Sequence, residues 1–234
     1  CGALAQYALA DVSDLSVVPE DLDLPTAAAL PVVYGTAHHA LTERGRARAG
    51  ETLLVLAAAG GVGLAAVQLG KALGLTVLAA AGGADKVETC RRHGADAVFD
   101  YRQDGWAEAV KAHTGAGGVD LVLDPVGSDY TGAALRVLGF GGRLLIVGFA
   151  GGDIPNIPAN RLLLKNLAAL GVIWGQWRRR YPQAAAAEMD QLFAYWREGL
   201  IAPPVSARHP LAAAPQAIVS LGGRATTGKV LVLP

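Results

Sequence analysis

Residues 52–74 contain an apolar strand, a glycine-rich turn and an apolar helix in direct succession, TLLVLAAAGGVGLAAVQLGKALG. The run Leu53–Ala57 has no alternating polar residue, which is typical of a strand buried on both faces of a parallel sheet. Gly60, Gly61 and Gly63 then open a helix whose apolar positions recur with the helical period. This order predicts the first strand-turn-helix unit of a parallel α/β fold.

The turn carries the pattern Ala58-x-Gly60-x-x-Gly63, a dinucleotide-binding fingerprint in which alanine replaces the first glycine. Gly60 would let the backbone approach a pyrophosphate, and Gly63 would let the helix pack closely on the strand. The free N–H groups of the first helical turn would face an anion. The alternative is tight packing without a ligand, and a lone imperfect fingerprint leaves it open.

A membrane helix is the second alternative for this stretch, because residues 52–70 carry no charge. The Gly60-Gly61 pair and a second short apolar run after Lys71 favour a buried sheet instead. We therefore expect no membrane partner.

Composition limits the remaining classes. The chain has 234 residues, 52% of them hydrophobic, and a formal net charge of zero, so it can bury a sizeable core and is no strongly basic nucleic-acid binder. Arg178–Arg180 form the one basic cluster, which we interpret as a solvated helix start or a local salt-bridge surface. Cys1 and Cys90 are too few for a disulfide framework, which favours a reducing, cytoplasmic setting. Because the chain opens without Met in what reads as mid-domain sequence, we expect a fragment.

The residues after the glycine turn repeat the strand-helix alternation. The expected strands are Thr76–Ala80, Ala97–Phe99, Val119–Leu123 and Arg143–Val147, with Ala168–Ile173 as a candidate sixth, and the helices between them are Asp85–His93, Trp106–His113 and Tyr130–Leu138. This pattern predicts a doubly wound parallel sheet with its ligand beyond the carboxyl ends of the strands.

The flanking segments are less regular. We expect two strand-like pieces within Ala3–Pro19 and two helical pieces, Thr26–Leu30 and Thr36–Leu41, interrupted near Pro31. In the tail we expect helices over Tyr181–Glu198 and Ala212–Leu221 and a closing strand over residues 228–233.

Several segments together resemble one known family, the medium-chain dehydrogenase/reductases, in their zinc-free quinone oxidoreductase (zeta-crystallin-like) branch. They are AAALPVVYGTAHHAL, VLAAAGGVGLAAVQLGKALG, HGADAVFDYR, DLVLDPVG, GGRLLIVGFAGG and RATTGKVLVLP, in family order over nearly the whole chain. The resemblance implies a Rossmann domain over residues 36–175. Residues 1–35 would be the end of a GroES-like substrate barrel, and residues 176–234 would return to it.

The resemblance also implies an activity and a site. Hydride would pass between NADP(H) and a small quinone, enone or aldehyde, without zinc. The pyrophosphate would lie on Ala58, Gly60, Gly61, Val62 and Gly63, with Arg224 as a second contact, while Asp124, Gly127, Gly148 and Phe149 would border the ribose and nicotinamide. Tyr34 is the candidate proton donor. The alternatives are an ordinary core phenylalanine at 149 and a satisfied buried tyrosine at 34.

The cofactor preference follows from a missing acid. An NAD site places Asp or Glu about twenty residues past the fingerprint, and Gly82 occupies that place here. Lys86 would instead bind the 2′-phosphate of NADPH, and the resemblance implies the same role for Tyr101, with Arg102 beside it. Asp85 would be the N-cap of the following helix, and the alternative for Lys86 is a solvated helix residue.

Other expectations concern metals, rivals and assembly. Ala27–Leu30 occupy the place of a zinc ligand in zinc-dependent relatives and cannot bind zinc, and adjacent His38 and His39 are expected at the surface. A non-enzymatic cofactor-binding or adaptor protein of the same fold stays open. We expect a homodimer through the apolar edge strand Ala168–Ile173, and a chain that binds cofactor but turns over substrate poorly by itself.

Overall fold

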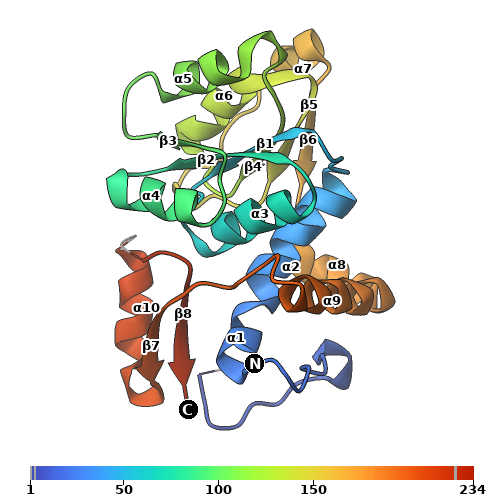
Figure 1. Ribbon diagram of the computed structural model, residues 1–234, viewed down its shortest axis with the longest axis vertical. Helices are drawn as coiled ribbons and strands as arrows, with labels where there is room; N and C mark the ends of the chain where they lie inside the picture. The colour runs from blue at the N-terminus through green and yellow to red at the C-terminus, as the bar shows by residue number, and fades with distance from the viewer. Residues whose placement is uncertain (1, 3, 224–225) are drawn as a thin grey trace.

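The computed structural model describes residue 2, residues 4–223 and residues 226–234 (Figure 1). Its centre is a parallel sheet of six strands in the order β3-β2-β1-β4-β5-β6. The strands are β1 (Thr52–Leu56), β2 (Thr76–Ala81), β3 (Ala97–Asp100), β4 (Val119–Asp124), β5 (Leu138–Ile146) and β6 (Ala168–Gly171). The order winds outwards in both directions from the neighbours β1 and β4, which confirms the predicted doubly wound Rossmann sheet.

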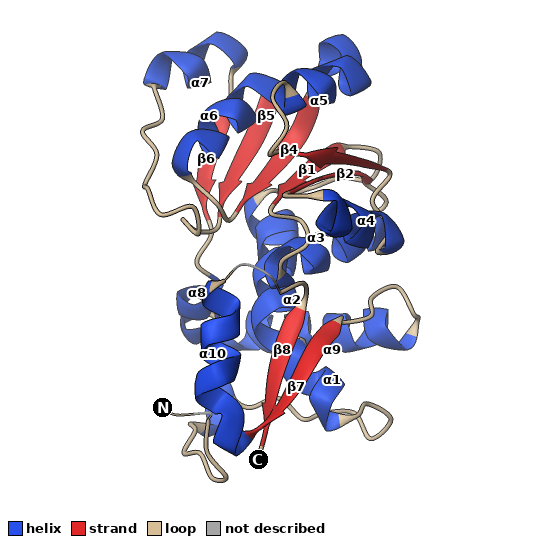
Figure 2. Ribbon diagram, turned by 90° about the vertical axis from the view of Figure 1, so that its left-hand side faces the viewer, coloured by secondary structure: helices blue, strands red, loops and turns tan. Residues whose placement is uncertain are grey.

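Strand β1 is buried on both faces, as its continuous apolar run predicts. Leu53 and Val55 pack into the core on one face, which α3 (Gly61–Ala72) and α4 (Ala84–Arg92) cover. Leu54 and Leu56 pack into the core on the other face, under α5 (Trp106–Thr114) and α6 (Ser128–Val137). Figure 2 shows these two helical layers on opposite sides of the sheet.

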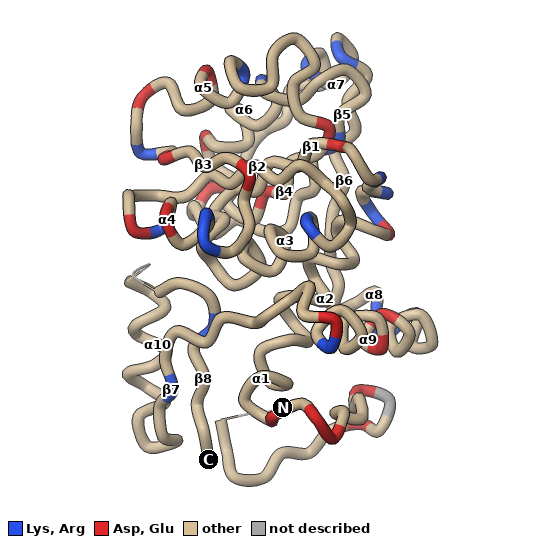
Figure 3. Tube along the Cα trace, viewed as in Figure 1, with Lys and Arg blue, Asp and Glu red and all other residues tan. Residues whose placement is uncertain are grey.

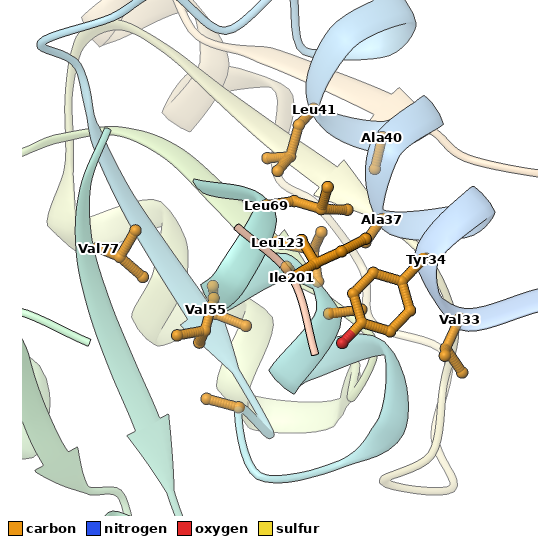
Figure 4. Packing of buried hydrophobic residues seen from close by; sticks show 14 of the residues in the cluster. Val33, Tyr34, Ala37, Ala40, Leu41, Val55, Leu69, Val77, Leu123 and Ile201 are labelled. Atoms are coloured by element: carbon orange, nitrogen blue, oxygen red, sulfur yellow. The ribbon is translucent and has the colours of Figure 1, made fainter. Parts of the chain in front are cut away.

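Two helices precede the sheet, α1 (Leu24–Ala29) and α2 (Pro31–His39), and α2 continues into a π-helical turn, η2 (Ala40–Arg44). The Asp23 side chain accepts the Thr26 N–H at 3.0 Å and starts α1. The break at Pro31 is confirmed, because Pro31 opens the second helix and donates no backbone hydrogen bond. Helix α2 packs its apolar face against α3 and β1, with Tyr34 and Leu41 pointing into that core (Figure 4).

The tail forms a second lobe below the large sheet (Figure 2). Helices α8 (Trp174–Arg180) and α9 (Pro182–Arg197) pack on α2, and the chain then forms β7 (Val205–Pro210), α10 (Ala214–Gly222) and β8 (Lys229–Leu233). Strands β7 and β8 pair in parallel as a sheet of their own.

Several sequence expectations were wrong. Among the described residues of the segment before Pro19, a 3₁₀ turn, η1 (Val12–Asp14), forms instead of strands, Leu9 and Val17 are exposed there, and no described strand pairs with the segment. The Arg178–Arg180 cluster ends a helix instead of starting one, which suits cations at the negative end of the helix dipole, and the alternative of a local salt-bridge surface fits the ion pair of Arg178 with Asp14 at 3.2 Å. The pattern also missed α7 (Ala159–Lys165), α8 and β7, which are short.

The charged residues and the lengths of the helices can be described along the same chain. Lys/Arg and Asp/Glu positions are interspersed along the described trace without a continuous basic stripe (Figure 3). In the part of the chain that the structure describes, no helix has the length and apolarity required to cross a bilayer.

Candidate cofactor site

The glycine turn joins the carboxyl end of β1 to the start of α3. Its left-handed residue is Ala57, with φ of 47°, and the Gly60 N–H donates to the Ala57 carbonyl at 2.9 Å. Ala58 is buried, has no positive φ, and donates its N–H to Ala80 of β2 at 3.0 Å. An alanine therefore fits the place of the fingerprint's first glycine, because the backbone there has an ordinary conformation.

Gly63 is the position where a side chain cannot fit. A Cβ atom on it would lie 2.4 Å from the Ala57 carbonyl oxygen and 2.7 Å from the Ala58 carbonyl carbon, so the helix touches the turn backbone directly. Gly61 faces Val33 of α2 in a less close contact than that of Gly63, and Val62 beside it is half-buried. The N-cap residue of α3 is Gly60, which has no side chain to cap the first turn, so the first N–H groups of the helix can face an anion.

A cavity of about 190 Å³ opens at the carboxyl ends of the central strands, beside this turn. It brings together three residues that were predicted to bind the cofactor and that lie far apart in the sequence, Gly60, Lys86 and Tyr101. The other lining residues are Ala57, Ala59, Ala81, Val126, Ala150 and Thr226. These groups thus converge on one hollow at the topological switch point of the sheet, where ligands bind in open α/β folds.

The place of the missing acid is occupied by a cation. A Cβ atom on buried Gly82 would lie 2.9 Å from Arg102 Nε and 3.0 Å from the Tyr101 ring, so both side chains cover this glycine. The Tyr101 ring is held edge-on against Tyr130, with centroids 4.8 Å apart. The Lys86 ammonium and the Tyr101 phenol therefore line one end of the cavity, and the Arg102 guanidinium lies beside Tyr101 over Gly82.

The capping role predicted for Asp85 was wrong. Gly83 is the N-cap of α4, and Asp85 lies within the first turn. The Gly83 N–H donates to Asp100 Oδ1 at 3.0 Å, and so does the Arg102 N–H at 3.0 Å. The Gly83 hydrogen bond, followed by that of Arg102, lowers the pKa of the Asp100 carboxyl. Asp100 thus stabilises the backbone at Gly83 and at Arg102 through these two hydrogen bonds.

Asp124 supports the loop after β4 through both of its carboxylate oxygens. Its buried Oδ1 accepts the N–H groups of Val126 at 2.8 Å and Gly127 at 2.9 Å, and its Oδ2 accepts the Thr131 hydroxyl at 2.6 Å. The side chain shapes the loop that lines the cavity through Val126 and does not itself reach into the hollow.

The loops after β4 and β5 are packed against each other. Gly127, at φ of 72°, contacts the Phe149 ring closely: a Cβ atom there would lie 2.9 Å from Cδ1. Phe149 is 41% exposed, so it is not the ordinary core phenylalanine of the alternative. Gly148 lies beside Pro125. Together these residues form the wall next to Val126 and Ala150.

Tyr34 lies apart from this cavity. It is buried in the core between α2 and α3, and its hydroxyl donates to Gln68 Oε1 at 2.7 Å (Figure 4). Burial raises the pKa of Tyr34 above its ordinary value. The structure thus places it with the satisfied buried tyrosines, and we assign it no catalytic role. Arg224 lies outside the described residues.

The adjacent histidines are not at the surface, contrary to the sequence expectation. His39 is buried against Trp177, with ring centroids 4.5 Å apart, and burial lowers its pKa. His38 Nδ1 lies 3.0 Å from Glu188 Oε1, and the Trp174 indole donates to Glu188 Oε2 at 2.5 Å. Over the described ranges, no three His, Cys, Asp or Glu side chains gather as a metal site would require.

A larger hollow of about 650 Å³ lies elsewhere, between the end of β6 and α8, with His39, Arg44 and Trp177 among its walls. It contains none of the residues predicted for the cofactor and is not at the glycine turn. We therefore place the candidate site at the smaller cavity, where the fingerprint and the basic groups meet.

The tail contributes contacts that sequence patterns did not reveal. Thr226 lines the cavity, Gly228 forms a parallel bridge with Gly60, and the Gly228 N–H donates to the Ala59 carbonyl at 3.0 Å. A glycine just before the last strand was the available signal, but only the fold brings residues so distant in sequence together.

Comparison with known proteins gives consistent matches. The family model described as "Zinc-binding dehydrogenase" matches residues 61–191. "Quinone oxidoreductase-like protein 2" of Bos taurus is 40% identical over 230 residues, 98% of this chain and 66% of that protein. The quinone oxidoreductase of Homo sapiens is 32% identical over 234 residues, 99% of this chain and 69% of that protein.

Solved structures agree with these relatives. A mycobacterial protein solved in complex with NADPH superposes with a TM-score of 0.93 at 33% identity, covering 100% of this chain and 72% of that one. The Escherichia coli quinone oxidoreductase complexed with NADPH gives 0.85 at 29% identity, covering 94% and 68%. The chain thus spans roughly two thirds of the length of these relatives, slightly less for the bovine protein.

Proposed function

Because the chain belongs to the medium-chain dehydrogenase/reductase family, in its quinone oxidoreductase branch, we propose that it provides the cofactor-binding part of an NADPH-dependent oxidoreductase. The substrate would be a small quinone, enone or similar carbonyl compound. The observation that carries the proposal is the cavity in which the glycine turn meets Lys86 and Tyr101. Two of the similar structures hold NADPH, which supports the same cofactor here.

The residues present fit a phosphorylated dinucleotide. The uncapped start of α3 offers N–H groups to the pyrophosphate, and the backbone approach is open because Gly60 and Gly63 have no side chains. When bound, the nicotinamide would supply the hydride. The chain's own part would be to bind and orient the cofactor and to exclude water with the loops at Gly127, Gly148 and Phe149.

The preference for NADPH over NADH is proposed from the Gly82 surroundings. A carboxylate there would accept the ribose hydroxyls of NADH and repel a 2′-phosphate. In its place lies the Arg102 guanidinium, with Lys86 and Tyr101 on the cavity wall. Each charge-assisted hydrogen bond to a phosphate contributes about 1.5–3 kcal/mol.

We expect NADPH to bind at least about tenfold more tightly than NADH, since about 1.4 kcal/mol corresponds to a factor of ten. Lys86→Ala and Arg102→Ala should each weaken NADPH by about tenfold or more and leave NADH within about twofold. Dissociation constants from fluorescence titration measure this. Lys111→Ala is the matched control, because Lys111 is exposed on α5 and does not line the cavity. Equal affinities of the unaltered chain for both cofactors would contradict the proposal.

NADPH consumption with a small quinone separates the enzyme from the adaptor alternative. Tight cofactor binding without turnover, in this chain and in a longer one, would favour an adaptor. We also propose catalysis without zinc, and chelator-washed protein should therefore retain its activity and contain no stoichiometric metal.

We further propose a homodimer through β6, the unpaired end of the six-stranded sheet, whose residues are small and apolar. An unpaired apolar edge associates readily with a second copy. Light scattering at high micromolar concentration should give twice the chain mass, and a monomer there would count against the proposal.

Two coarser proposals complete the assignment. Residues 36–175 would form the cofactor domain, with residues 1–35 and 176–234 belonging to the substrate domain, in keeping with the two lobes of Figure 2. A cytoplasmic setting is supported by Cys90, a free buried thiol whose pKa burial raises to about 12.

A further inference from the structure

Gln68 of α3 is a buried amide that uses both of its ends. Its Oε1 accepts the Tyr34 hydroxyl at 2.7 Å and the Ala202 N–H at 2.8 Å. Its Nε2 donates to the Ala202 carbonyl at 3.0 Å and lies 3.0 Å from His93 Nδ1. The side chain is 6% exposed and does not line the cofactor cavity. All of its hydrogen-bonding capacity is therefore directed at its surroundings.

The surrounding groups agree on one orientation of this amide. Tyr34 and the Ala202 N–H are donors and face the oxygen, whereas the Ala202 carbonyl and His93 Nδ1 face the nitrogen. Burial, followed by the charge of Arg92, lowers the pKa of His93, which favours the neutral ring, and Nδ1 accepts from the amide in the tautomer that carries its proton on Nε2. The amide is thus locked in place rather than free to turn.

The two hydrogen bonds between the Gln68 amide and the Ala202 backbone fix the segment that leads back to the second lobe, and we call them the clamp at Ala202. Ala202 is followed by Pro203 and Pro204, which have no N–H groups and fixed φ angles. These two residues cannot be held by backbone N–H donation of their own. The clamp at Ala202 holds the chain just before Pro203 and Pro204, and the Pro204 carbonyl is the next backbone group with a partner.

Pro204 in turn contacts the start of the tail strand β8, which lies against the glycine turn. Its carbonyl accepts the Lys229 N–H at 2.8 Å, and a Cβ atom on Gly228 would lie 2.5 Å from the same oxygen. Gly228 then donates to Ala59 at 3.0 Å and bridges Gly60. A continuous set of contacts thus runs from Gln68 to the turn that lines the cavity.

We propose that Gln68 is a positioning residue for the cofactor: by fixing Ala202 and Pro204 it sets Gly228 and Thr226 over the pyrophosphate side of the site. The inference rests on the proposed function, since it concerns the same cavity. It assigns no contact between Gln68 and the cofactor. Its effect should appear in the affinity for the whole dinucleotide and not at the 2′-phosphate end.

The test compares two ligands in Gln68→Met, which keeps the approximate volume and removes the amide. NADPH is expected to bind about tenfold or more weakly, whereas adenosine 2′-monophosphate, which reaches only the Lys86, Tyr101 and Arg102 end, should stay within about twofold. Pro204→Gly leaves the buried core unchanged and frees the same backbone, so it should weaken NADPH in the same direction. This second variant keeps the test decisive if Gln68→Met does not fold.

Tyr34→Phe is the matched control. It removes one bond from the same amide but leaves both bonds to Ala202, so the affinity for NADPH should change by less than about threefold. Should both ligands weaken in proportion to the fall in Tm across Gln68→Met and Tyr34→Phe, Gln68 has only a structural role. Unchanged NADPH affinity in Gln68→Met and Pro204→Gly would overturn the inference while leaving the proposed function intact. Failure of the unaltered chain to bind NADPH would instead refute the proposed function.

Discussion

Gly63→Ala is expected to destabilise the fold and to abolish measurable cofactor binding. The added Cβ would lie 2.4 Å from the Ala57 carbonyl oxygen and 2.7 Å from the Ala58 backbone, and backbone atoms on both sides cannot rotate away as a side chain can. Helix α3 would have to move off β1. Overpacking costs about 1–3 kcal/mol, and we expect the upper part of this range despite the better helix propensity of alanine.

Thermal or denaturant unfolding and NADPH titration measure this effect. A loss of about 3 kcal/mol corresponds to a fall in Tm of roughly 6–12 °C for a chain of this size. The matched control is Gly132→Ala on α6, where a Cβ atom would meet nothing within 4 Å. That variant should be as stable as the unaltered chain or slightly more so. If Gly63→Ala kept full stability and affinity, the close packing of helix on turn would not be what the site requires.

The central sheet was predictable because its signals are local. A strand buried on both faces shows an unbroken apolar run, and the glycines after β1 mark the turn, so β1, β2, β4 and the helices between them fall within a few residues of their expected bounds. Strand β5 begins earlier than expected, at Leu138, because it follows α6 directly and pairs with Val119 before a register shift. Periodicity has no means of showing such a shift.

The parts that could not be predicted depend on distant partners. Strand β7 exists because β8 pairs with it. His39 is buried against Trp177 of α8, and His38 is half-buried beside Glu188 of α9. The same holds for the site. Lys86 was found from its place near the empty acidic position and Tyr101 from the family resemblance, whereas Thr226 and Gly228 reach the glycine turn only through the fold of the tail.

Asp124 shows how a correct location can conceal a different role. The sequence placed it at the end of β4 beside the cofactor, and the structure keeps it at that strand end. Its oxygens, however, are used by Val126, Gly127 and Thr131. A carboxylate after a parallel strand is therefore as well suited to hold a loop as to bind a ligand, and the sequence alone does not separate the two.

Asp124→Ala should accordingly reduce stability first and cofactor affinity as a consequence. The variant leaves two buried N–H groups and one hydroxyl without an acceptor, and each unsatisfied buried group costs about 1–3 kcal/mol. We expect a total loss of about 3–5 kcal/mol, since some of these groups will regain water. Denaturant unfolding measures it, and the loop wall at Val126 should loosen with a weaker affinity for NADPH.

Further variants at this loop separate the contributions of the three hydrogen bonds that Asp124 accepts. Asp124→Asn retains an acceptor for Val126 and Gly127 and turns an N–H group towards Thr131, whose hydroxyl can then accept, so most of the stability should return. Thr131→Val removes only the third bond, at about 1 kcal/mol. Asp129→Ala is the control, an exposed carboxylate in the first turn of α6 that should cost less than about 1 kcal/mol. If Asp124→Ala proved no more costly than Asp129→Ala, or bound NADPH as tightly as the unaltered chain, the loop would be held by its packing against Phe149 and not by this carboxylate.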